Sequence, residues 1–276
     1  MTDGEGVGEA DAAEASAGLP DRDGIADAVR GTRWGAVEVV ESTGSTNADL
    51  MARVGEPGLA GTVRITTHQT QGRGRHTRVW ETPPGRQVAI SAAVGVTDHT
   101  ERLGWLSLVA GMAAAGAIET VTGVRPTLKW PNDVLIDDRK TAGILSEYAP
   151  APTGGIAVIG IGINTRMSAD DLPVPTATSL LIATGAPVDH TALVAAYLRE
   201  LSGWLDRWPD DVAGLAAAYR QRCDTIGRRV RLDLPDGSEV LGVASGVDDA
   251  GRIEVDADGR SVVASAADVT HLRSVD

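Results

Sequence analysis

The stretch HQTQGRGRHTRVW, residues 68–80, concentrates cationic and flexible residues in a chain whose formal net charge is −13. Guanidinium groups bind phosphate or carboxylate through parallel N–H donors. Glycines let a backbone approach a ligand closely, and a tryptophan offers a flat face to a base. The residues concerned are Arg73, Arg75, Arg78, Gly72, Gly74 and Trp80. The pattern predicts a flexible loop that meets an anionic nucleotide; a solvated basic turn and an RNA-contacting patch are the alternatives, and the Walker A pattern is absent.

A second stretch, KWPNDVLI, places an amide and a carboxylate side by side at Asn132 and Asp133. Pro131 fixes the backbone just before them. A carboxylate at a strand end can hold Mg²⁺ together with substrate phosphates, which makes Asp133 a candidate metal ligand. An ordinary Pro-Asn-Asp turn between two strands is the alternative interpretation.

Two further short patterns carry residues that can act on an anion or lie close to a ligand. RKTAGILSE places Lys140 at the mouth of a predicted strand, three residues before Gly143. There a lysine can act as a point charge for carboxylate or phosphate, or simply point into water. GIGIN, ending at Asn164, has glycines that permit close approach on a buried strand. It is not the dinucleotide pattern GxGxxG, because no third glycine opens a helix.

The hydrophobic pattern predicts the elements that must position these residues. Alternating or continuous apolar runs predict strands at 36–41, 62–69 and 86–94, a hairpin formed by LKWPNDVLI and KTAGILSEYA, and a buried strand in GGIAVIGIGINT. Helices are expected after a cap at Ser45 or Thr46, over 104–123 with Gly123 as its end, and at about 189–207 and 209–221. The middle of the chain, residues 31–225, is therefore predicted to be an α/β domain with a mixed sheet.

The two ends of the chain differ from its middle. Residues 1–30 hold eight acidic and two basic side chains and few apolar ones, so a disordered acidic tail is expected, within which RDGIADAVR is compatible with a short helix. Residues 226–276 contain three turn signals between short alternating runs. They are Asp236-Gly237, Ala250-Gly251 and Asp258-Gly259. This spacing predicts a small antiparallel β-barrel or meander.

Composition excludes several classes of function. The acidic balance disfavours general nucleic-acid binding, which needs a basic face to release counterions, and disfavours binding to an anionic membrane. A single cysteine, Cys223, cannot form an intramolecular disulfide and fits a reducing compartment. The longest apolar run, residues 105–118, is too short to span a bilayer. A cytoplasmic protein without a secretory signal is expected.

The order and spacing of STGSTN, HQTQGRGRHTRVW, LKWPNDVLI, RKTAGILSE and GIGIN resemble the biotin protein ligase family. The resemblance implies a class II synthetase-like α/β domain followed by a small SH3-like β-barrel. It also implies a reaction in which biotin and ATP give biotinyl-5′-AMP, whose biotinyl group passes to a lysine of a biotin carboxyl carrier domain of an acyl-CoA carboxylase. The chain is similar to the shorter members without a DNA-binding domain, acting as a monomer or weak homodimer, with Mg²⁺ and without DNA or membrane.

The resemblance also implies roles for individual residues. Biotin contacts are expected from Ser45, Thr46, Asn47, Gln69, Arg73, Gly74, Arg75, Lys140 and Gly143. Adenylate contacts are expected from Arg75, Arg78, Trp80, Lys129, Asn132 and Asn164, with Asp133 as the magnesium ligand. The residues expected to act in catalysis are Lys140, Arg73 and Arg75, because the carboxylate of biotin and the α-phosphate of ATP repel each other and need cations.

Two positions depart from the family pattern, and two rival functions stay open. Thr77 stands where the family has a glycine in the arginine loop, and Thr141 follows Lys140 where leucine is common.

A lipoate or octanoate ligase of the same superfamily is the nearest rival function, although it would not need the Ser-Thr-Asn trio. A non-catalytic biotin-responsive regulator is the second.

Overall fold

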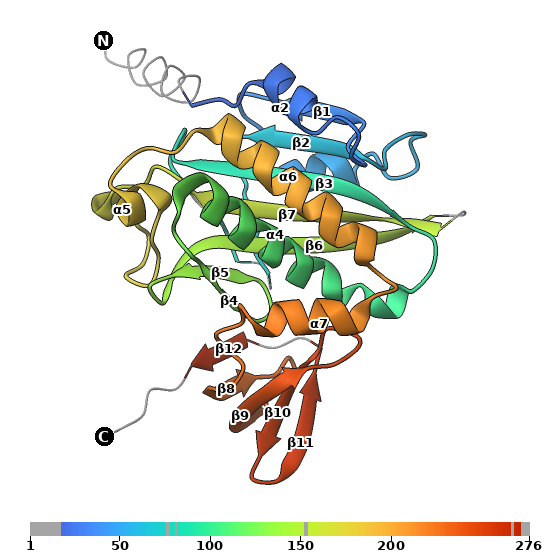
Figure 1. Cartoon of the computed structure of the whole chain (residues 1–276), viewed down its shortest axis with the longest axis vertical. Coiled ribbons are helices and arrows are strands. Elements are labelled where there is room, and N and C mark those ends of the chain that lie inside the picture. The colour runs from blue at the N-terminus through green and yellow to red at the C-terminus, as the bar shows by residue number, and fades with distance from the viewer. Residues whose placement is uncertain (1–17, 76–77, 81, 152–153, 266–267, 272–276) are drawn as a thin grey trace, which may run out of the picture.

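The computed structural model describes residues 18–75, 78–80, 82–151, 154–265 and 268–271, and its larger part is built on a seven-stranded mixed sheet. The spatial order is β1-β2-β3-β7-β6-β5-β4, in which only the β1–β2 pair is parallel. The strands are β1 (Ala36–Val39), β2 (Thr62–Thr66), β3 (Gln87–Val96), β4 (Thr127–Lys129), β5 (Asp133–Ile136), β6 (Arg139–Ala151) and β7 (Gly154–Asn164). The predicted mixed sheet is confirmed (Figure 1).

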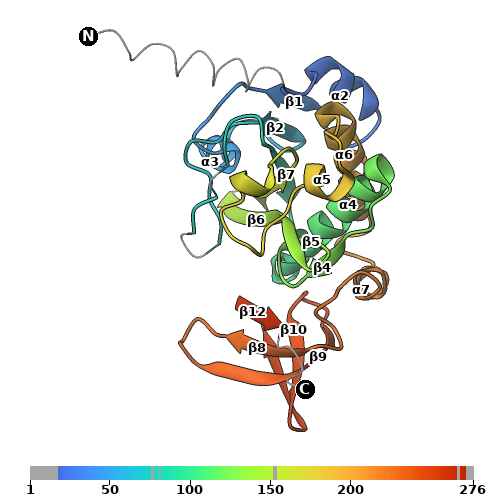
Figure 2. The ribbon, with the colours of Figure 1, turned by 90° about the vertical axis from the view of Figure 1, so that its left-hand side faces the viewer.

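Helices cover the two faces of this sheet unequally. The long helices α4 (Gly104–Thr122) and α6 (His190–Arg207) pack on one face with α2 (Arg22–Ala28) and α5 (Leu180–Thr184), while α3 (Thr46–Met51) lies on the other (Figure 2). The remaining helical segments are α7 (Val212–Arg220) and two 3₁₀ turns, Thr100–Arg102 and Ala169–Asp171. The face that carries α3 is therefore the more open one, and it holds the candidate site.

Helix α4 is the central support of the core. It ends as predicted at Gly123, whose φ of 74° lies in the left-handed region that favours glycine. Within the described part of the chain, α4 is the helix long and apolar enough to cross a membrane, but 67% of its apolar window is buried inside the protein. Such burial is typical of the core helix of a globular domain.

The C-terminal part forms a separate five-stranded antiparallel sheet, as the turn signals predict. Its order is β11-β10-β9-β8-β12, and its strands are β8 (Arg229–Asp233), β9 (Glu239–Val247), β10 (Ile253–Ala257), β11 (Arg260–Ala264) and β12 (Asp268–His271). The glycines of the three predicted turns, Gly237, Gly251 and Gly259, all have positive φ. Each turn therefore uses the conformational freedom that its Gly supplies.

Two buried tryptophans join the C-terminal sheet to the larger domain. The indole N–H of Trp105 donates to the carbonyl of Asp249 (2.9 Å), and that of Trp130 donates to the carbonyl of Gly251 (3.0 Å). The backbone N–H of Trp130 also donates to the hydroxyl of Thr225 (3.1 Å). The C-terminal sheet is thus attached directly to the segment that carries Asn132 and Asp133.

The expected acidic tail to residue 30 is too long. Helix α2 begins at a cap formed by Asp21, and its Ile25 and the following Val29 are buried in the main core. Two apolar side chains four residues apart form one stripe of a helix, and that stripe packs on α6. The rest of the predicted tail, residues 1–17, lies outside the described residues.

Candidate functional site

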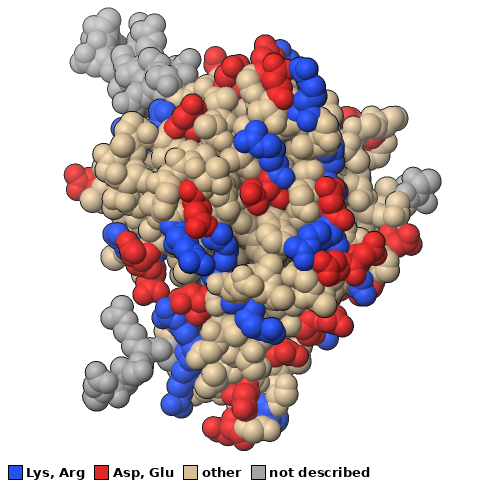
Figure 3. All heavy atoms as spheres, in the orientation of Figure 1, with Lys and Arg blue, Asp and Glu red and all other residues tan. Residues whose placement is uncertain are grey.

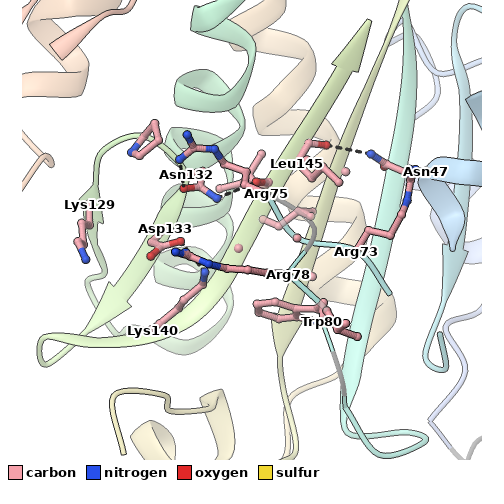
Figure 4. Close-up of a pocket in the computed structure, with 18 of the residues that line it drawn as sticks. Asn47, Arg73, Arg75, Arg78, Trp80, Lys129, Asn132, Asp133, Lys140 and Leu145 are labelled. Carbon is pink, nitrogen blue, oxygen red and sulfur yellow. Dashed lines mark hydrogen bonds and ion pairs between the residues drawn. The ribbon is translucent and has the colours of Figure 1, made fainter. Parts of the chain in front are cut away.

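A cavity of about 410 Å³ opens on the face of the sheet that carries α3 (Figure 4). Its walls come from α3, the arginine loop, the β5–β6 hairpin, the central strands and the C-terminal sheet. The structure brings fourteen sequence-predicted residues together here: Ser45, Thr46, Asn47, Gln69, Arg73, Gly74, Arg75, Arg78, Trp80, Lys129, Asn132, Asp133, Lys140 and Gly143. Residues from four separate sequence patterns therefore meet in one place.

Glycines on the central strand β7 form the floor of the cavity. Gly160 lies between Ser91 of β3 and Leu145 of β6 in the sheet register. A methyl group on Gly160 would collide with the amide oxygen of Asn47, and one on Gly162 would come within 2.7 Å of the Trp80 indole nitrogen. The expected close approach to this strand is confirmed, and here it accommodates an amide and an indole ring.

The side chain of Asn47 is held in one orientation by the sheet. Its Nδ2 donates to the carbonyl of Leu145 (3.0 Å) and to Oε2 of Glu147 (2.9 Å), while its Oδ1 accepts from the hydroxyl of Ser91 (2.6 Å). Both amide hydrogens are therefore used within the protein. The amide oxygen, which has a second lone pair, is the part of Asn47 that can bind a ligand.

Gln69 is oriented in the opposite sense. Its Oε1 accepts from the backbone N–H of Thr46 (2.9 Å) and lies 3.2 Å from the Thr46 hydroxyl. These contacts engage the oxygen only, so the NH₂ group is the part that Gln69 can turn toward a ligand. Ser45 caps α3 by accepting from the backbone N–H of Ala48, and so fixes the start of the helix that carries Thr46 and Asn47.

The other half of the cavity is cationic. Lys140 Nζ lies 2.6 Å from Oδ1 of Asp133 and 5.4 Å from the centre of the Trp80 ring. Trp80 is itself positioned by donating its indole N–H to the side-chain oxygen of buried Gln87 (2.6 Å). The chain has two lysines in all, Lys129 and Lys140, and both line the cavity.

The arginine loop reaches across the cavity from one wall to the other. Arg73 pairs with Glu147 of β6 (2.7 Å), and Arg75 donates to the side-chain oxygen of Asn132 (3.3 Å). Figure 4 shows the side chain of Arg78 extending toward Asp133 and Lys140. The site thus combines a small polar end near Asn47 with an anion-binding end between the loop and the hairpin.

Comparison with known proteins shows to which family this chain belongs. Residues 39–164 match the model of the biotin/lipoate A/B protein ligase family, and residues 225–272 match the biotin protein ligase C-terminal domain. A biotin–[acetyl-CoA-carboxylase] ligase of Mycobacterium tuberculosis is 44% identical over 248 residues, which cover 88% of this chain and 91% of that protein. The chain belongs to the biotin protein ligase family.

More distant relatives agree with this membership of the biotin protein ligases. The bifunctional ligase/repressor BirA of Escherichia coli is 32% identical over 82% of this chain and 70% of its own length. Among solved structures, the biotin protein ligase from Aquifex aeolicus in complex with biotin and ATP superposes with a TM-score of 0.70, at 22% identity over 86% of this chain and 98% of that one. At this identity the match concerns the fold alone.

One predicted contact residue of this family member does not reach the cavity wall. Asn164 is buried at the end of β7, where its Nδ2 donates to the carbonyl of Thr178 (3.0 Å). Its contact with a nucleotide stays a prediction. Of the two departures from the family pattern, Thr141 is fully buried beside Lys140, and Thr77 lies outside the described residues.

Several residues of the site were missed by the sequence reasoning. Ser91 and Gln87 lie on β3, Glu147 lies on β6, and the C-terminal sheet contributes Asp233, Val269 and Thr270. A serine in the continuous apolar run AISAAV was a usable signal for Ser91, because a buried hydroxyl needs hydrogen-bond partners. Glu147 ends the RKTAGILSE pattern but was given no role, and no local pattern marked the C-terminal residues.

Proposed function

We propose that the protein activates biotin with ATP to biotinyl-5′-AMP and then transfers the biotinyl group to a lysine of a biotin carboxyl carrier domain of an acyl-CoA carboxylase. The relative from M. tuberculosis, named as a ligase of biotin and acetyl-CoA carboxylase, supports the proposal over 88% of this chain and 91% of its own. The observation that carries it is the fixed pair of amides, Asn47 and Gln69, at the small end of the cavity.

The two amides suit the ureido ring of biotin. That ring has N–H donors and a carbonyl acceptor, and the site offers an oriented acceptor at Asn47 and an oriented donor at Gln69. A polar group that leaves water must find its partners in the protein, so a matched pair favours a ligand with both kinds of group. The dithiolane ring of lipoate has neither an amide donor nor a carbonyl, so this end of the cavity favours biotin over lipoate.

The cationic half of the cavity suits the first chemical step. An oxygen of the biotin carboxylate attacks the α-phosphorus of ATP, a carbon–oxygen–phosphorus anhydride forms, and pyrophosphate leaves with the electron pair of the broken bond. Two anions must approach each other, and charge develops at phosphorus. Lys140, Arg73 and Arg75 line the cavity where this charge develops, and fixed cations there lower the barrier.

The residues present fit a magnesium ion that arrives with ATP. Asp133 and Asp233 are the carboxylates among the described residues that line the cavity, and the described residues contain no cluster of three or more His, Cys, Asp or Glu side chains. Mg²⁺ is commonly held by one or two carboxylates together with substrate phosphates. When bound, the ion would neutralise phosphate charge, and Asp133 is the residue that would hold it.

In the second step the amine of the carrier lysine attacks the biotinyl carbonyl, an amide bond forms, and AMP leaves. The attacking amine must lose a proton. No histidine is among the described residues that line the cavity, so we assign the proton to solvent or to Asp133.

We propose that residues 31–225, extended by the packed segment that begins at residue 18, hold the reactants. Residues 226–276 complete the wall of the cavity.

We further propose a cytoplasmic location and a monomer or weak homodimer. Cys223 is buried, and burial raises the pKa of its thiol, so the cysteine suits a reducing compartment without a reactive role. On the face shown in Figure 3, acidic and basic side chains are interspersed and do not gather into one basic field. That surface is consistent with a partner other than DNA.

Incubation with ATP, Mg²⁺, labelled biotin and a carrier domain tests the proposal. We expect biotin-dependent release of pyrophosphate, bound biotinyl-AMP, and label on the carrier that disappears when its acceptor lysine is changed to arginine. Pyrophosphate release that depends on lipoate and not on biotin would assign the protein to the lipoate ligases. Tight, sequence-specific DNA binding in low salt without adenylate formation would assign it to the regulators.

A further inference from the structure

Glu147 stands outside the predicted site and outside the cavity wall, yet it contacts two residues that define the cavity. It lies on β6 opposite Val158 of β7, and its side chain is 25% exposed. One of its oxygens, Oε2, accepts from Nδ2 of Asn47 at 2.9 Å and lies 2.7 Å from Nη2 of Arg73. A single carboxylate oxygen therefore joins α3 to the arginine loop (Figure 4 shows Asn47 and Arg73 on the same side of the cavity).

The Asn47 contact decides which part of that side chain a ligand meets. Asn47 is 4% exposed, and its other amide hydrogen is held by the Leu145 carbonyl. If Glu147 did not accept the second hydrogen, a buried N–H of Asn47 would lose its partner, and the amide could rotate away from Ser91. Glu147 thus helps to keep Asn47 an acceptor, which is the role that an N–H group of the ligand requires.

The Arg73 contact fixes the loop against the sheet. Within the described part of the loop, its own backbone hydrogen bonds run from Gly74 N to the Arg78 carbonyl, from Arg78 N to the Arg75 carbonyl and from Trp80 N to the Gly72 carbonyl. These bonds shape the loop but do not attach it to the strands of the floor. Side chains make that attachment at two points: the Trp80 indole binds Gln87 of β3, and the Arg73 side chain, 42% exposed, binds Glu147 of β6.

An ordinary surface ion pair would show the same distance between nitrogen and oxygen and would have little effect on stability. Two features set Glu147 apart. Its acceptor oxygen is shared with a buried amide whose remaining hydrogen-bonding groups are all fixed by the sheet. Its cationic partner, Arg73, belongs to a different segment of the chain, the arginine loop, and lines the cavity.

We infer that Glu147 is a positioning residue that couples recognition of the biotin ring by Asn47 to the position of Arg73 over the cavity. This inference rests on the proposed function and deepens it. A ligand N–H bound by the Asn47 oxygen strengthens the orientation that Glu147 holds, and the same carboxylate keeps Arg73 over the cavity. Retention of the adenylate therefore depends on a residue that does not line the cavity.

Glu147→Gln removes the charge that holds Arg73 while keeping the shape of the side chain. We expect the dissociation rate of biotinyl-AMP and the Kd of biotin to rise about tenfold, since a charge-assisted hydrogen bond is lost, while the KM of ATP changes less than twofold. The matched control is Glu56→Gln, which breaks an exposed pair with Arg53 (3.0 Å) away from the cavity and should leave all three constants unchanged.

A double-mutant cycle separates coupling from general loosening. Arg73→Ala alone should raise the adenylate dissociation rate to a similar extent, and Glu147→Gln combined with Arg73→Ala should add little more. Additive effects of the two changes, or a dissociation rate in Glu147→Gln equal to that of the Glu56→Gln control, would overturn the inference.

A ligand-free measurement keeps this inference separate from the proposed function. Hydrogen exchange at the amide of Trp80 should be faster in Glu147→Gln than in the parent when no biotin or ATP is present, with exchange in α4 unchanged. If the parent forms no biotinyl-AMP, the proposed function fails while this measurement still tests the loop attachment. Equal exchange at Trp80 in both proteins contradicts the attachment even if the parent is an active ligase.

Discussion

The side chain of Lys140 extends along β6 toward Gly143, so that its ammonium group reaches Asp133, whose Oδ1 is 2.6 Å away. In the register of the β5–β6 hairpin, Asp133 is opposite Gly143, while Lys140 is opposite Leu135, beside a bulge. A methyl group on Gly143 would come within 3.0 Å of the Lys140 Cε and the Trp80 ring. Gly143, predicted as a biotin contact, therefore also makes room for the lysine and the tryptophan that face the anion.

Lys140→Ala is expected to abolish most adenylate formation while leaving the fold intact. Removal of one preorganised charge at a developing anion typically slows the chemical step by about 10²- to 10³-fold, and the side chain is 33% exposed, so the core is not disturbed. Single-turnover synthesis of biotinyl-AMP measures the effect, with circular dichroism as the check on folding. An unchanged single-turnover rate would refute the assigned role.

Gly160→Ala is expected to weaken biotin binding with little change in the affinity for ATP. The new methyl group collides with the Asn47 amide oxygen, so Asn47 must leave the position in which Ser91 and Leu145 hold it. Isothermal titration with biotin and with ATP separates the two effects, and we expect at least about a tenfold rise in the Kd of biotin.

The matched control for this change is Gly203→Ala. Gly203 lies within α6, and a methyl group there meets no atom within 4 Å. Alanine in a helix should raise the free energy of unfolding by about 0.5–1 kcal/mol and leave biotin binding unchanged. Biotin affinity that is the same in Gly160→Ala and Gly203→Ala contradicts the role given to the glycine floor.

Ser91 and Glu147 differ in how well the sequence alone could have predicted their roles. The strand β3 is buried on both faces from Gln87 to Val94, so a serine within that continuous apolar run could have been flagged as a buried polar residue in need of partners. The partners of Asn47 lie 44 and 100 residues away in sequence, and strand order, not local pattern, brings them together. Short motifs therefore predicted the residues of the cavity but not those that orient them.

The surroundings of Asn164 and of the N-terminal segment differ from what local patterns indicated, and the physical reason is the same in both cases. The GIGIN pattern located the right strand, but the last side chain of that strand turns to the Thr178 carbonyl, a contact with a later segment. Helix α2 has too few apolar residues to be predicted as part of the core. Its Ile25 and Val29 become buried only because α6, more than 160 residues later, covers them.

Arg75→Ala is expected to speed the release of biotinyl-AMP. Arg75 donates to the side-chain oxygen of Asn132 across the cavity, so its loss removes a cation from the anion-binding end and one contact between loop and hairpin. Stopped-flow Trp fluorescence should give a dissociation rate about tenfold above that of the parent. Arg30→Ala, at a side chain that is 79% exposed in the turn after α2, serves as control. Equal off-rates in the two variants would contradict the prediction.

His190 is expected to make the fold sensitive to acid. Its ring nitrogens lie 2.5 Å from the carbonyl of Gly18 and 2.7 Å from the hydroxyl of Thr165. Burial lowers the pKa of His190 from 6.5 to about 4, helped by the charge of Arg166 and opposed by the Gly18 hydrogen bond and Asp189. The unfolded chain therefore binds a proton at a higher pH than the folded protein does.

The sign of the effect follows from this difference. The contribution of neutral His190 to stability is complete above pH 6.5 and is lost as the pH falls toward 4. Between pH 7 and pH 5 this single group should lower the free energy of unfolding by about 2 kcal/mol. Burial lowers the pKa of His271 too, so His271 adds a smaller loss of the same sign. Urea unfolding at pH 7, 6 and 5 should therefore show a shallower pH dependence in His190→Gln than in the parent, and parallel curves for the two proteins would show that His190 is not the group responsible.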